Sequence, residues 1–382
     1  MIYLDHASAT PVSDKVLRAM TPFMTDDFFN PSSAYLPAVR VRDAYENAKN
    51  SIANSIGAKG NDLVITSGAT EANALAMTVV SKNGKILVLE TEHASILENV
   101  KKYKFDIIKV DKNGLINLDD LKSKLSDEVE LVSVSLANNE LGTIQPLAEI
   151  SRILKESRLD RLKRGITTQL LLHSDSSQGL ALLELNIARL GVDLMTLNSA
   201  KICGPKGVGA LYVGHDVRLT PLTSGGGQER GLRAGTENVA GVIGFATAIE
   251  AIRGHSSAAR KKYTALVSIL KKELEKAKIA PIFLGNAKHQ LANFLPVSFP
   301  GLDAERLVFK LEEQEVYVST GAACSASKGE PSHVLRAIGL TDTEIAGSLR
   351  LSLGVLNDEE NVQQAGKIIR KVVDDEVRRI YG

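Results

Sequence analysis

The sequence predicts an α/β fold: a large domain whose mostly parallel sheet is covered by helices on both faces, plus a smaller α/β C-terminal domain. Short apolar runs alternate with amphipathic helical stretches through the first two-thirds of the chain, a pattern typical of strands joined by crossover helices. From about residue 256 a charged amphipathic helix introduces mixed α/β sequence. The length of 382 residues also exceeds what one compact core ordinarily holds.

The strands of the large domain are predicted from six apolar runs. These runs are 63–66, 85–90, 130–136, 169–174, 193–197 and 208–213. Helical patterns separate most of them: the apolar residues that follow Gly68 recur from Ala72 to Val79 with the spacing i, i+3, i+4, i+7. The basic segment 152–164 is interpreted as the solvated face of one such helix.

The change in sequence texture at residue 256 sets the domain boundaries. We assign residues 11–255 to the large domain, and residues 1–10 together with 256–382 to the small domain. No linker rich in Pro, Gly or Ser divides the chain, and it contains neither an internal repeat nor a low-complexity tract.

Composition argues against several classes of protein. Lys and Arg number 46 and Asp and Glu 45, so the net charge of +1 gives no overall field that would attract nucleic acid or an anionic membrane. The longest uncharged run, 289–302, is shorter than the roughly 18 apolar residues of a membrane helix. The N-terminal residues lack the pattern of a secretory signal. We therefore expect a cytoplasmic protein that binds neither membrane nor nucleic acid directly.

The two cysteines, Cys203 and Cys324, exclude a disulfide framework, and the chain has no CxxC motif for zinc or redox chemistry. We expect no metal site. Each cysteine is either a small buried apolar residue or, where its surroundings stabilise the thiolate, a nucleophile.

Polar residues gather directly after five of the predicted strands. The clusters are 67–71, 91–93, 137–140, 175–178 and 198–201. The carboxyl ends of parallel strands share one edge of a sheet, where ligands bind. Turns are polar in any protein, but ordinary turns rarely combine Lys, Asp, His and Asn, so we predict that the five clusters line one pocket.

The residue types in these clusters suit one cofactor. The small residues that open a helix after Gly68 allow backbone amides to approach a phosphate. Lys201 follows a buried strand and suits a Schiff base, while Asp175 could hold a protonated pyridine nitrogen. These are the three requirements of pyridoxal 5′-phosphate. The chain has neither GxGxxG after a strand nor GxxxxGK[ST], which argues against a dinucleotide-dependent dehydrogenase and a P-loop NTPase.

The chain as a whole resembles the cysteine desulfurases of the IscS/NifS type, which belong to the class V aminotransferases among the fold-type I pyridoxal-phosphate enzymes. The matching motifs include YLDHASATP (3–11), TSGATEAN (66–73), TEH (91–93), NNELGTIQP (138–146), HSDSSQ (173–178), GPKGVGALYV (204–213), GGGQERGLRAGTEN (225–238), STGAACSASKGEPSHVLRAIG (319–339) and SLRLSLG (348–354).

The resemblance implies a set of cofactor-binding residues. They are Gly68, Ala69, Thr70, His93, Asp175, Gln178, Asn198, Lys201 and Thr236. Lys201 matches the lysine that binds the cofactor covalently, Asp175 the partner of the pyridine nitrogen, and Gln178 the residue that faces the ring hydroxyl. Thr236 matches a threonine that reaches the phosphate in the partner subunit, which implies a homodimer.

The resemblance also implies the catalytic and substrate-binding residues. His93 matches a histidine that stacks on the ring and takes part in proton transfer, and Cys324 matches the catalytic cysteine that becomes a persulfide. Asn139 and Arg350 match the residues that hold the carboxylate of L-cysteine. The implied reaction yields L-alanine and passes sulfur to an acceptor protein such as an iron–sulfur scaffold, for iron–sulfur cluster assembly or tRNA thiolation.

Ala200 departs from the family pattern, because relatives usually have His before the lysine. This removes a phosphate donor that the amide of Asn198 could replace. Two alternatives remain: another enzyme of the same fold, such as a selenocysteine lyase or an aminotransferase, and a scaffold or regulatory protein of a sulfur-transfer complex that binds little cofactor. The sequence does not identify the sulfur acceptor. It also does not show whether cysteine or selenocysteine is the preferred substrate.

Overall fold

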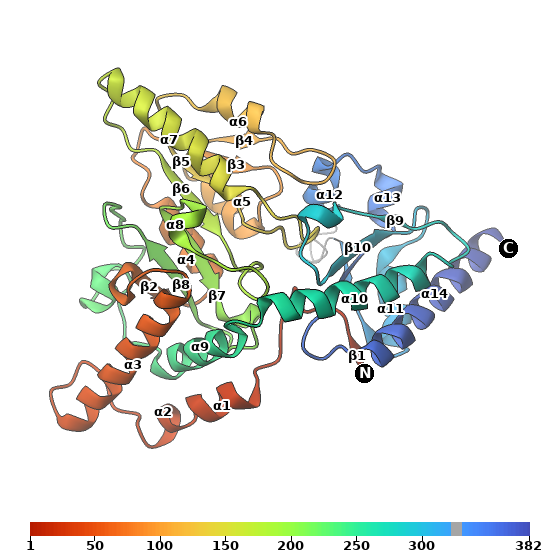
Figure 1. Cartoon of the computed structure of the whole chain (residues 1–382), viewed down its shortest axis with the longest axis horizontal. Coiled ribbons are helices and arrows are strands. Elements are labelled where there is room, and N and C mark those ends of the chain that lie inside the picture. The colour runs from red at the N-terminus through yellow and green to blue at the C-terminus, as the bar shows by residue number, and fades with distance from the viewer. Residues whose placement is uncertain (322–330) are drawn as a thin grey trace.

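The computed structural model describes residues 1–321 and 331–382, and shows a larger and a smaller lobe with helix α10 (Ser256–Leu274) running from one to the other (Figure 1). Within the described residues, the sheet of the larger lobe has seven strands in the order β2-β8-β7-β6-β5-β3-β4. They are β2 (Leu63–Thr66), β3 (Lys85–Leu89), β4 (Lys104–Ile108), β5 (Val129–Ser133), β6 (Leu171–Asp175), β7 (Leu194–Asn198) and β8 (Gly209–Val213). Strand β8 runs antiparallel to both of its neighbours, and the remaining pairs are parallel.

The six predicted strands are confirmed, each with ends shifted by at most a few residues. Strand β4 was not predicted. It lies at the edge of the sheet, beside β3 alone among the described strands, and its first residues, Lys104 and Phe105, are exposed. An edge strand with little cover lacks the continuous apolar run that marks a buried parallel strand.

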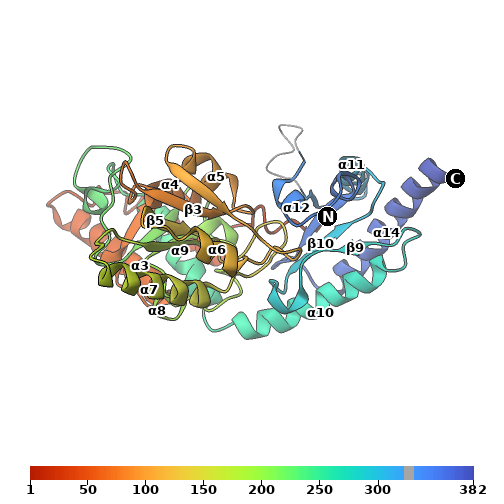
Figure 2. The same cartoon turned by 90° about the horizontal axis from the view of Figure 1, so that it is seen from above.

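Helices cover both faces of this sheet, as predicted (Figure 2). They are α1 (Asp14–Met20), α2 (Pro22–Thr25), α3 (Leu36–Ser55), α4 (Ala69–Met77), α5 (Ala94–Val100), α6 (Leu118–Lys124), α7 (Leu147–Lys163), α8 (Ile187–Leu190) and α9 (Val239–Ile252). Alternate strand residues face opposite sides: Val64 packs in the core with α4 and α5, whereas Leu63 and Ile65 pack in the core with α3, α7 and α9.

The smaller lobe is built from both ends of the chain. Its described elements are β1 (Ile2–Tyr3), β9 (Ile282–Phe283), β10 (Phe294–Ser298), α11 (Ala304–Glu312), β11 (Val316–Tyr317), β12 (Ser319–Thr320), α12 (His333–Ala337), α13 (Asp342–Ala346), β13 (Ser348–Ser352) and α14 (Glu359–Tyr381), with α10. Strand β1 pairs in parallel with β11, and Asp5 forms a β-bridge with Ser352, the last residue of β13. The predicted boundaries at residues 10/11 and 255/256 stay a prediction.

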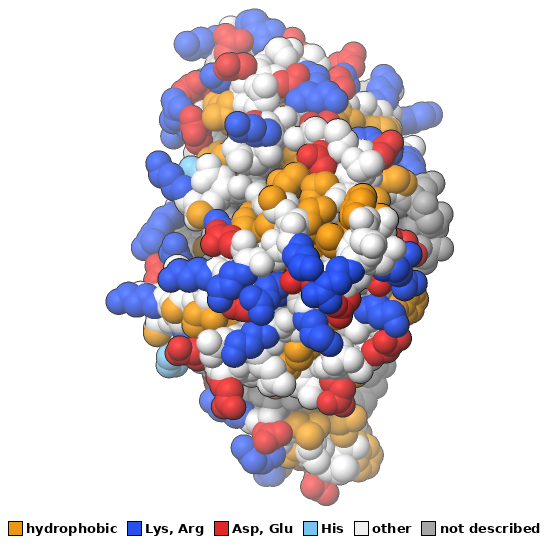
Figure 3. All heavy atoms as spheres, turned by 90° about the vertical axis from the view of Figure 1, so that its right-hand side faces the viewer, with side chains coloured by type: hydrophobic (Ala, Val, Ile, Leu, Met, Phe, Trp, Pro, Cys, Tyr) orange, Lys and Arg blue, Asp and Glu red, His pale blue; other side chains and the backbone are white. Residues whose placement is uncertain are grey.

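The surface carries both signs of charge. On the face at the small-lobe end, Lys and Arg side chains gather across the middle, with acidic side chains among them and an apolar area beside them (Figure 3). Charged side chains of the smaller lobe also pair between helices: Glu376 on α14 accepts from Arg306 on α11 at 2.7 Å. None of the described helices combines the length and apolar character needed to cross a bilayer.

Arg161 departs from the prediction that segment 152–164 is a solvated helix face. The segment lies on α7, where Arg152 is exposed and paired with Glu156 at 3.3 Å. The side chain of Arg161, in contrast, is only 2% exposed and donates to the backbone carbonyls of Val129 (2.9 Å) and Ser126. It satisfies acceptors around the start of β5, a role that helical periodicity does not reveal.

We predict that Arg161→Met lowers the free energy of unfolding by about 2–4 kcal/mol, because the buried carbonyl of Val129 and the partly buried carbonyl of Ser126 lose a charged donor. The matched change Arg152→Met on the exposed face of the same helix should cost no more than about 0.5 kcal/mol. Urea denaturation followed by circular dichroism compares the two midpoints. Equal midpoints would show that the buried contacts of Arg161 add nothing to stability.

Candidate active site

One cavity lies at the carboxyl ends of the strands of the large sheet. Its volume is about 370 Å³, within the usual range of small-molecule sites. The residues that line it are Ala7, Ser8, Ala69, Thr70, His93, Ser135, Ala137, Asn139, Asp175, Ser177, Gln178, Asn198, Lys201 and Arg350. All five polar clusters after the predicted strands contribute at least one of these residues, so the parallel strands bring them together.

The N-terminus of helix α4 forms one wall of the cavity through Ala69 and Thr70. Gly68 caps the helix with a φ of +150°, a conformation that residues with a side chain rarely adopt. A Cβ atom on the neighbouring Gly209 would lie 2.8 Å from the Cα of Gly68, so glycine is also needed there for β8 to pass. The exposed amides and the dipole of α4 favour an anionic group at this wall.

Lys201 projects from a 3-10 turn, η2 (Ser199–Lys201), that directly follows β7. The side-chain oxygen of Asn198 accepts a hydrogen bond from the amide of Ala200 at 3.1 Å and so caps this turn. The Nζ atom of Lys201 donates to the carbonyls of Ala7 (2.8 Å) and Ser8 (2.7 Å). The amine therefore lies at the cavity wall, against the N-terminal segment of the chain.

Asp175 ends strand β6 and is buried, with 8% of its surface exposed. Its two carboxylate oxygens accept from neutral donors, Oδ1 from the amide of Ser177 (3.0 Å) and Oδ2 from the side chain of Asn73 (2.8 Å). A buried carboxylate with neutral donors is suited to a cationic ligand atom. Gln178, one turn later, donates to the carbonyl of Ala7 at 3.0 Å.

His93 caps the N-terminus of α5 and lines the same cavity. Its Nδ1 atom accepts from the amide of Ser95 at 3.1 Å and lies 2.8 Å from the Ser95 hydroxyl. Burial lowers the pKa of His93 below its usual value, partly offset by the negative charge of Asp175. The ring is thereby favoured in its neutral form.

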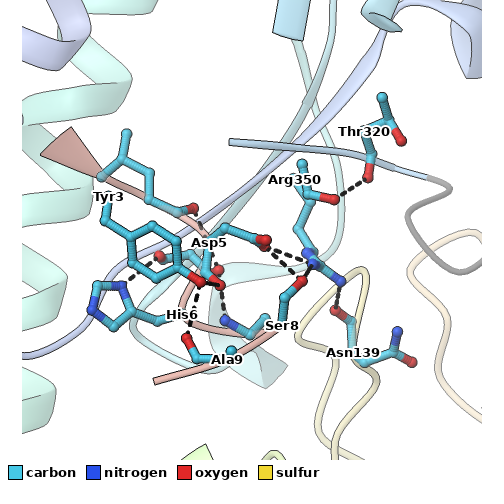
Figure 4. A network of polar contacts seen from close by, with 12 residues as sticks. Tyr3, Asp5, His6, Ser8, Ala9, Asn139, Thr320 and Arg350 are labelled. Atoms are coloured by element: carbon cyan, nitrogen blue, oxygen red, sulfur yellow. Dashed lines mark hydrogen bonds and ion pairs between the residues drawn. The ribbon is translucent and has the colours of Figure 1, made fainter. Parts of the chain in front are cut away.

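Arg350 reaches the cavity from β13 of the smaller lobe (Figure 4). Its guanidinium donates to Asp5 (2.7 Å), Ser8 (2.5 Å) and the carbonyl of Asn139 (3.1 Å). The side chain is only 3% exposed, and its Nε atom has no hydrogen-bond partner among the described residues. A buried guanidinium with an unused donor is suited to bind a carboxylate.

Two buried glutamates flank the site. Glu92 accepts from the amide (2.6 Å) and the hydroxyl of Ser135, and its backbone carbonyl lies 3.0 Å from Nε2 of His333. Glu140 accepts from the hydroxyl of Ser332. Burial raises the pKa of Glu92 to about 8 and that of Glu140 to about 7.

Two of the predicted residues that the structure describes do not line this cavity. Gly68 supports it as the cap of α4. Thr236 lines a second, open cavity together with Glu71 and Arg233, which form an ion pair at 3.3 Å. Cys324 lies outside the described residues.

The N-terminal residues that cross the site are functional contacts without a predicted role. The carbonyls of Ala7 and Ser8 accept from Lys201, Asp5 holds Arg350, and Thr10 donates to the carbonyl of Ala200 at 2.9 Å. These residues belong to the motif YLDHASATP, and its polar residues Asp5 and Ser8 are the sequence signal that could have indicated their role in the site. The hydrogen-bond partners of these residues depend on how the two lobes pack together.

The donor set fits pyridoxal phosphate. The amides of α4 would hold its phosphate, Asp175 would hold its ring nitrogen, and Lys201 would bind its aldehyde carbon. The supporting observation is the chemistry of the cavity wall, which combines an amine, a helix N-terminus and a buried carboxylate hydrogen-bonded to neutral groups. The side-chain oxygen of Asn198 caps η2. Its side-chain amide nitrogen is therefore the group that could replace the phosphate donor missing at Ala200.

The fold and the cavity together indicate the class of protein to which the chain belongs. Residues 2–365 match the family model described as Aminotransferase class-V, so the chain belongs to that family. It is 38% identical to "Cysteine desulfurase IscS" of Dictyoglomus turgidum, over 98% of this chain and 94% of that protein. A solved "NifS-like protein" has a TM-score of 0.89 and 32% identity, covering 98% of this chain and 99% of that one. A structure described as "SspA in complex with cysteine" has a TM-score of 0.79 and 29% identity, covering 92% and 99%.

We predict that the stability of the protein falls with rising pH partly because of Glu92. Its pKa is about 8 in the folded protein against 4.5 ordinarily, so the folded state retains a proton that the unfolded chain releases. The stabilising contribution is complete below pH 4.5 and is lost as the pH rises through about 8.

The variant Glu92→Gln keeps the shape of the side chain but cannot ionise. Its melting temperature should fall less than that of the unmodified protein between pH 5 and pH 8. Glu149→Gln, a change at an exposed position of α7, should follow the unmodified protein at every pH. Parallel curves for all three proteins would show that Glu92 does not titrate in this window.

Proposed function

We propose that this chain is a pyridoxal-phosphate-dependent cysteine desulfurase that converts L-cysteine to L-alanine and transfers the sulfur to Cys324 as a persulfide. The observation that supports this most directly is the single cavity that brings together Lys201, Asp175, His93 and Arg350. Relatives described as cysteine desulfurases match the chain over nearly its whole length, and a relative of known structure is described as a complex with cysteine.

The substrate carboxylate would bind at Arg350. The Nε–H of this guanidinium is buried and not used by the described residues, and its two terminal nitrogens are held in place by Asp5, Ser8 and the carbonyl of Asn139. These contacts fix the orientation of the planar group before substrate arrives, which reduces the ordering cost of binding. The side chain of Asn139, which also lines the cavity, is the second proposed carboxylate ligand.

Lys201 and His93 are the proposed proton carriers. When bound, pyridoxal phosphate supplies an aldehyde carbon and an aromatic ring that accepts electrons from the substrate Cα. The Nζ atom of Lys201 would hold the cofactor at that carbon and, when not bonded to it, would be the base that takes the Cα proton of the substrate. Asp175 would hold the ring nitrogen in its protonated form, and His93, which lines the same cavity, would carry a proton to or from the substrate.

Sulfur transfer would require the thiolate of Cys324. Its sulfur attacks the substrate sulfur, a new S–S bond forms, and the Cβ–S bond breaks with its electron pair left on the carbon skeleton. That carbon then takes a proton and leaves as alanine. The residues on either side of the segment that contains Cys324 support this role, because Ser319–Thr320 pairs with the strand of Arg350 and His333 contacts Glu92 beside His93.

The finer features of this function are proposals as well. A homodimer in which Thr236 completes the partner's phosphate site follows from the family resemblance, and so does a sulfur-acceptor protein such as an iron–sulfur scaffold. The place of Thr236 at a second, open cavity is compatible with contact to another chain. A cytoplasmic location stays a prediction.

We predict that the purified protein with added pyridoxal phosphate produces equimolar alanine and sulfide from L-cysteine in the presence of a thiol reductant. Lys201→Ala should abolish both products, because the amine that binds the cofactor is absent. Cys324→Ala should retain cofactor absorbance and its change on mixing with cysteine, but should release no sulfide.

Each outcome distinguishes one alternative. Undiminished sulfide release by Cys324→Ala would contradict direct attack by this thiol. A colourless protein that does not bind added cofactor would instead support a scaffold or regulatory role. Higher activity toward selenocysteine, or alanine formation that requires a keto acid, would favour a lyase or an aminotransferase.

We predict that Arg350→Gln raises the KM for L-cysteine by about tenfold to hundredfold, because hydrogen bonds to a charged group of this kind contribute about 1.5–3 kcal/mol. The Kd for pyridoxal phosphate should change by less than about threefold. Arg336→Gln, at an exposed position of α12, should leave both constants unchanged. An unaltered KM in Arg350→Gln would exclude this residue as the carboxylate ligand.

A further inference from the structure

Asn73 lies at the centre of the site but outside the set of residues that line the cavity. It belongs to α4, three residues after Thr70, and its side chain is fully buried. Its amide nitrogen donates one hydrogen bond to Oδ2 of Asp175 (2.8 Å) and another to the hydroxyl of Ser95 (2.9 Å). Both hydrogens of the amide are therefore used, and they connect two different elements, β6 and α5.

The contact with Asp175 fixes the carboxylate from one side. The amide of Ser177 donates to Oδ1 at 3.0 Å, and Asn73 donates to Oδ2 at 2.8 Å. Donors on both oxygens prevent rotation of the carboxylate about its Cβ–Cγ bond. Both donors are neutral groups, so neither would compete with a cationic ligand atom for the carboxylate. Asp175 is thus held ready for a cationic atom in the cavity.

The contact with Ser95 determines the direction of hydrogen bonding to His93. The amide nitrogen of Asn73 can only donate, so the Ser95 oxygen accepts there and its own proton is available for Nδ1 of His93, at 2.8 Å. The backbone amide of Ser95 also donates to Nδ1, at 3.1 Å. Since Nδ1 accepts from both groups, the proton of the neutral ring lies on Nε2.

We propose that Asn73 is a positioning residue that fixes the Asp175 carboxylate directly and the ring of His93 through Ser95. This inference rests on the proposed function, because it assigns those two groups to the cofactor and substrate. It adds a reason for the place of Asn73 on α4: the helix that presents its amides to an anion also orients, one turn later, the carboxylate and the imidazole of the same cavity.

The first variant is Asn73→Asp, which keeps the shape of the side chain but replaces the donor with a carboxylate next to Asp175. We expect the Kd for pyridoxal phosphate, measured by absorbance titration of the apoprotein, to rise about tenfold to hundredfold through loss of a hydrogen bond to a charged group. Asn99→Asp is the matched control, because Asn99 lies on nearby α5 and donates to the backbone carbonyl of Ser95 instead. Its Kd should stay within about twofold of the unmodified protein.

The second variant, Ser95→Ala, removes only the arm that leads to His93. Its Kd for pyridoxal phosphate should stay within about twofold of the unmodified protein. The rate of the absorbance change on mixing with L-cysteine, measured by stopped flow, should fall about tenfold. This variant also tests the inference if Asn73→Asp does not fold, which thermal melting of the apoprotein would reveal.

A Kd in Asn73→Asp equal to that of Asn99→Asp would overturn the inference, and so would an unchanged stopped-flow rate in Ser95→Ala. Both results together would leave Asn73 as a packing residue. These outcomes differ from failure of the proposed function, in which the unmodified protein itself would neither bind pyridoxal phosphate nor respond to cysteine.

Discussion

The N-terminal segment, residues 5–10, is the constraint on which the site depends. Its first residues pair with the smaller lobe through Asp5 and Ser352, and its last residue, Thr10, is bonded to Ala200 of the larger lobe. Between these anchors, carbonyls of the segment accept from Lys201 while the Asp5 carboxylate holds Arg350. Through these contacts the segment holds the lysine of one lobe and the arginine of the other at one cavity.

Burial sets the charge distribution of the cavity. It raises the pKa values of Glu92 and Glu140 and lowers that of His93, and in each case the neutral form is favoured. The charged groups are those with dense hydrogen bonding, such as Arg350 with its three acceptors. Because Glu92, Glu140 and His93 favour their neutral forms, the formal charges of the site lie on the groups that would contact cofactor and substrate.

The parallel sheet explains why most of the side chains that line the cavity come from residues at or just after the ends of strands. Strands β2, β3, β5, β6 and β7 end at the same edge, and each is followed by a turn or a helix start that presents one or two polar side chains. Secondary contacts then adjust these side chains: Asn198 caps η2 below Lys201, and Asn73 joins α4 to β6 and α5. The chemistry proposed for the chain combines a rigid sheet edge with side chains supplied by the smaller lobe.

The fold class, six of the strands and most of the residues that line the cavity could be predicted from the amino-acid sequence, because apolar periodicity and polar residues at strand ends are local signals. The sequence did not reveal the edge strand β4, the buried role of Arg161, or the contacts of Asp5 and Asn73. Those depend on which groups meet after packing: Asp5 meets Arg350 from 345 positions away, and Asn73 meets Asp175 from 102 positions away. A donor and an acceptor so distant in sequence share no periodicity, so only the tertiary structure could pair them.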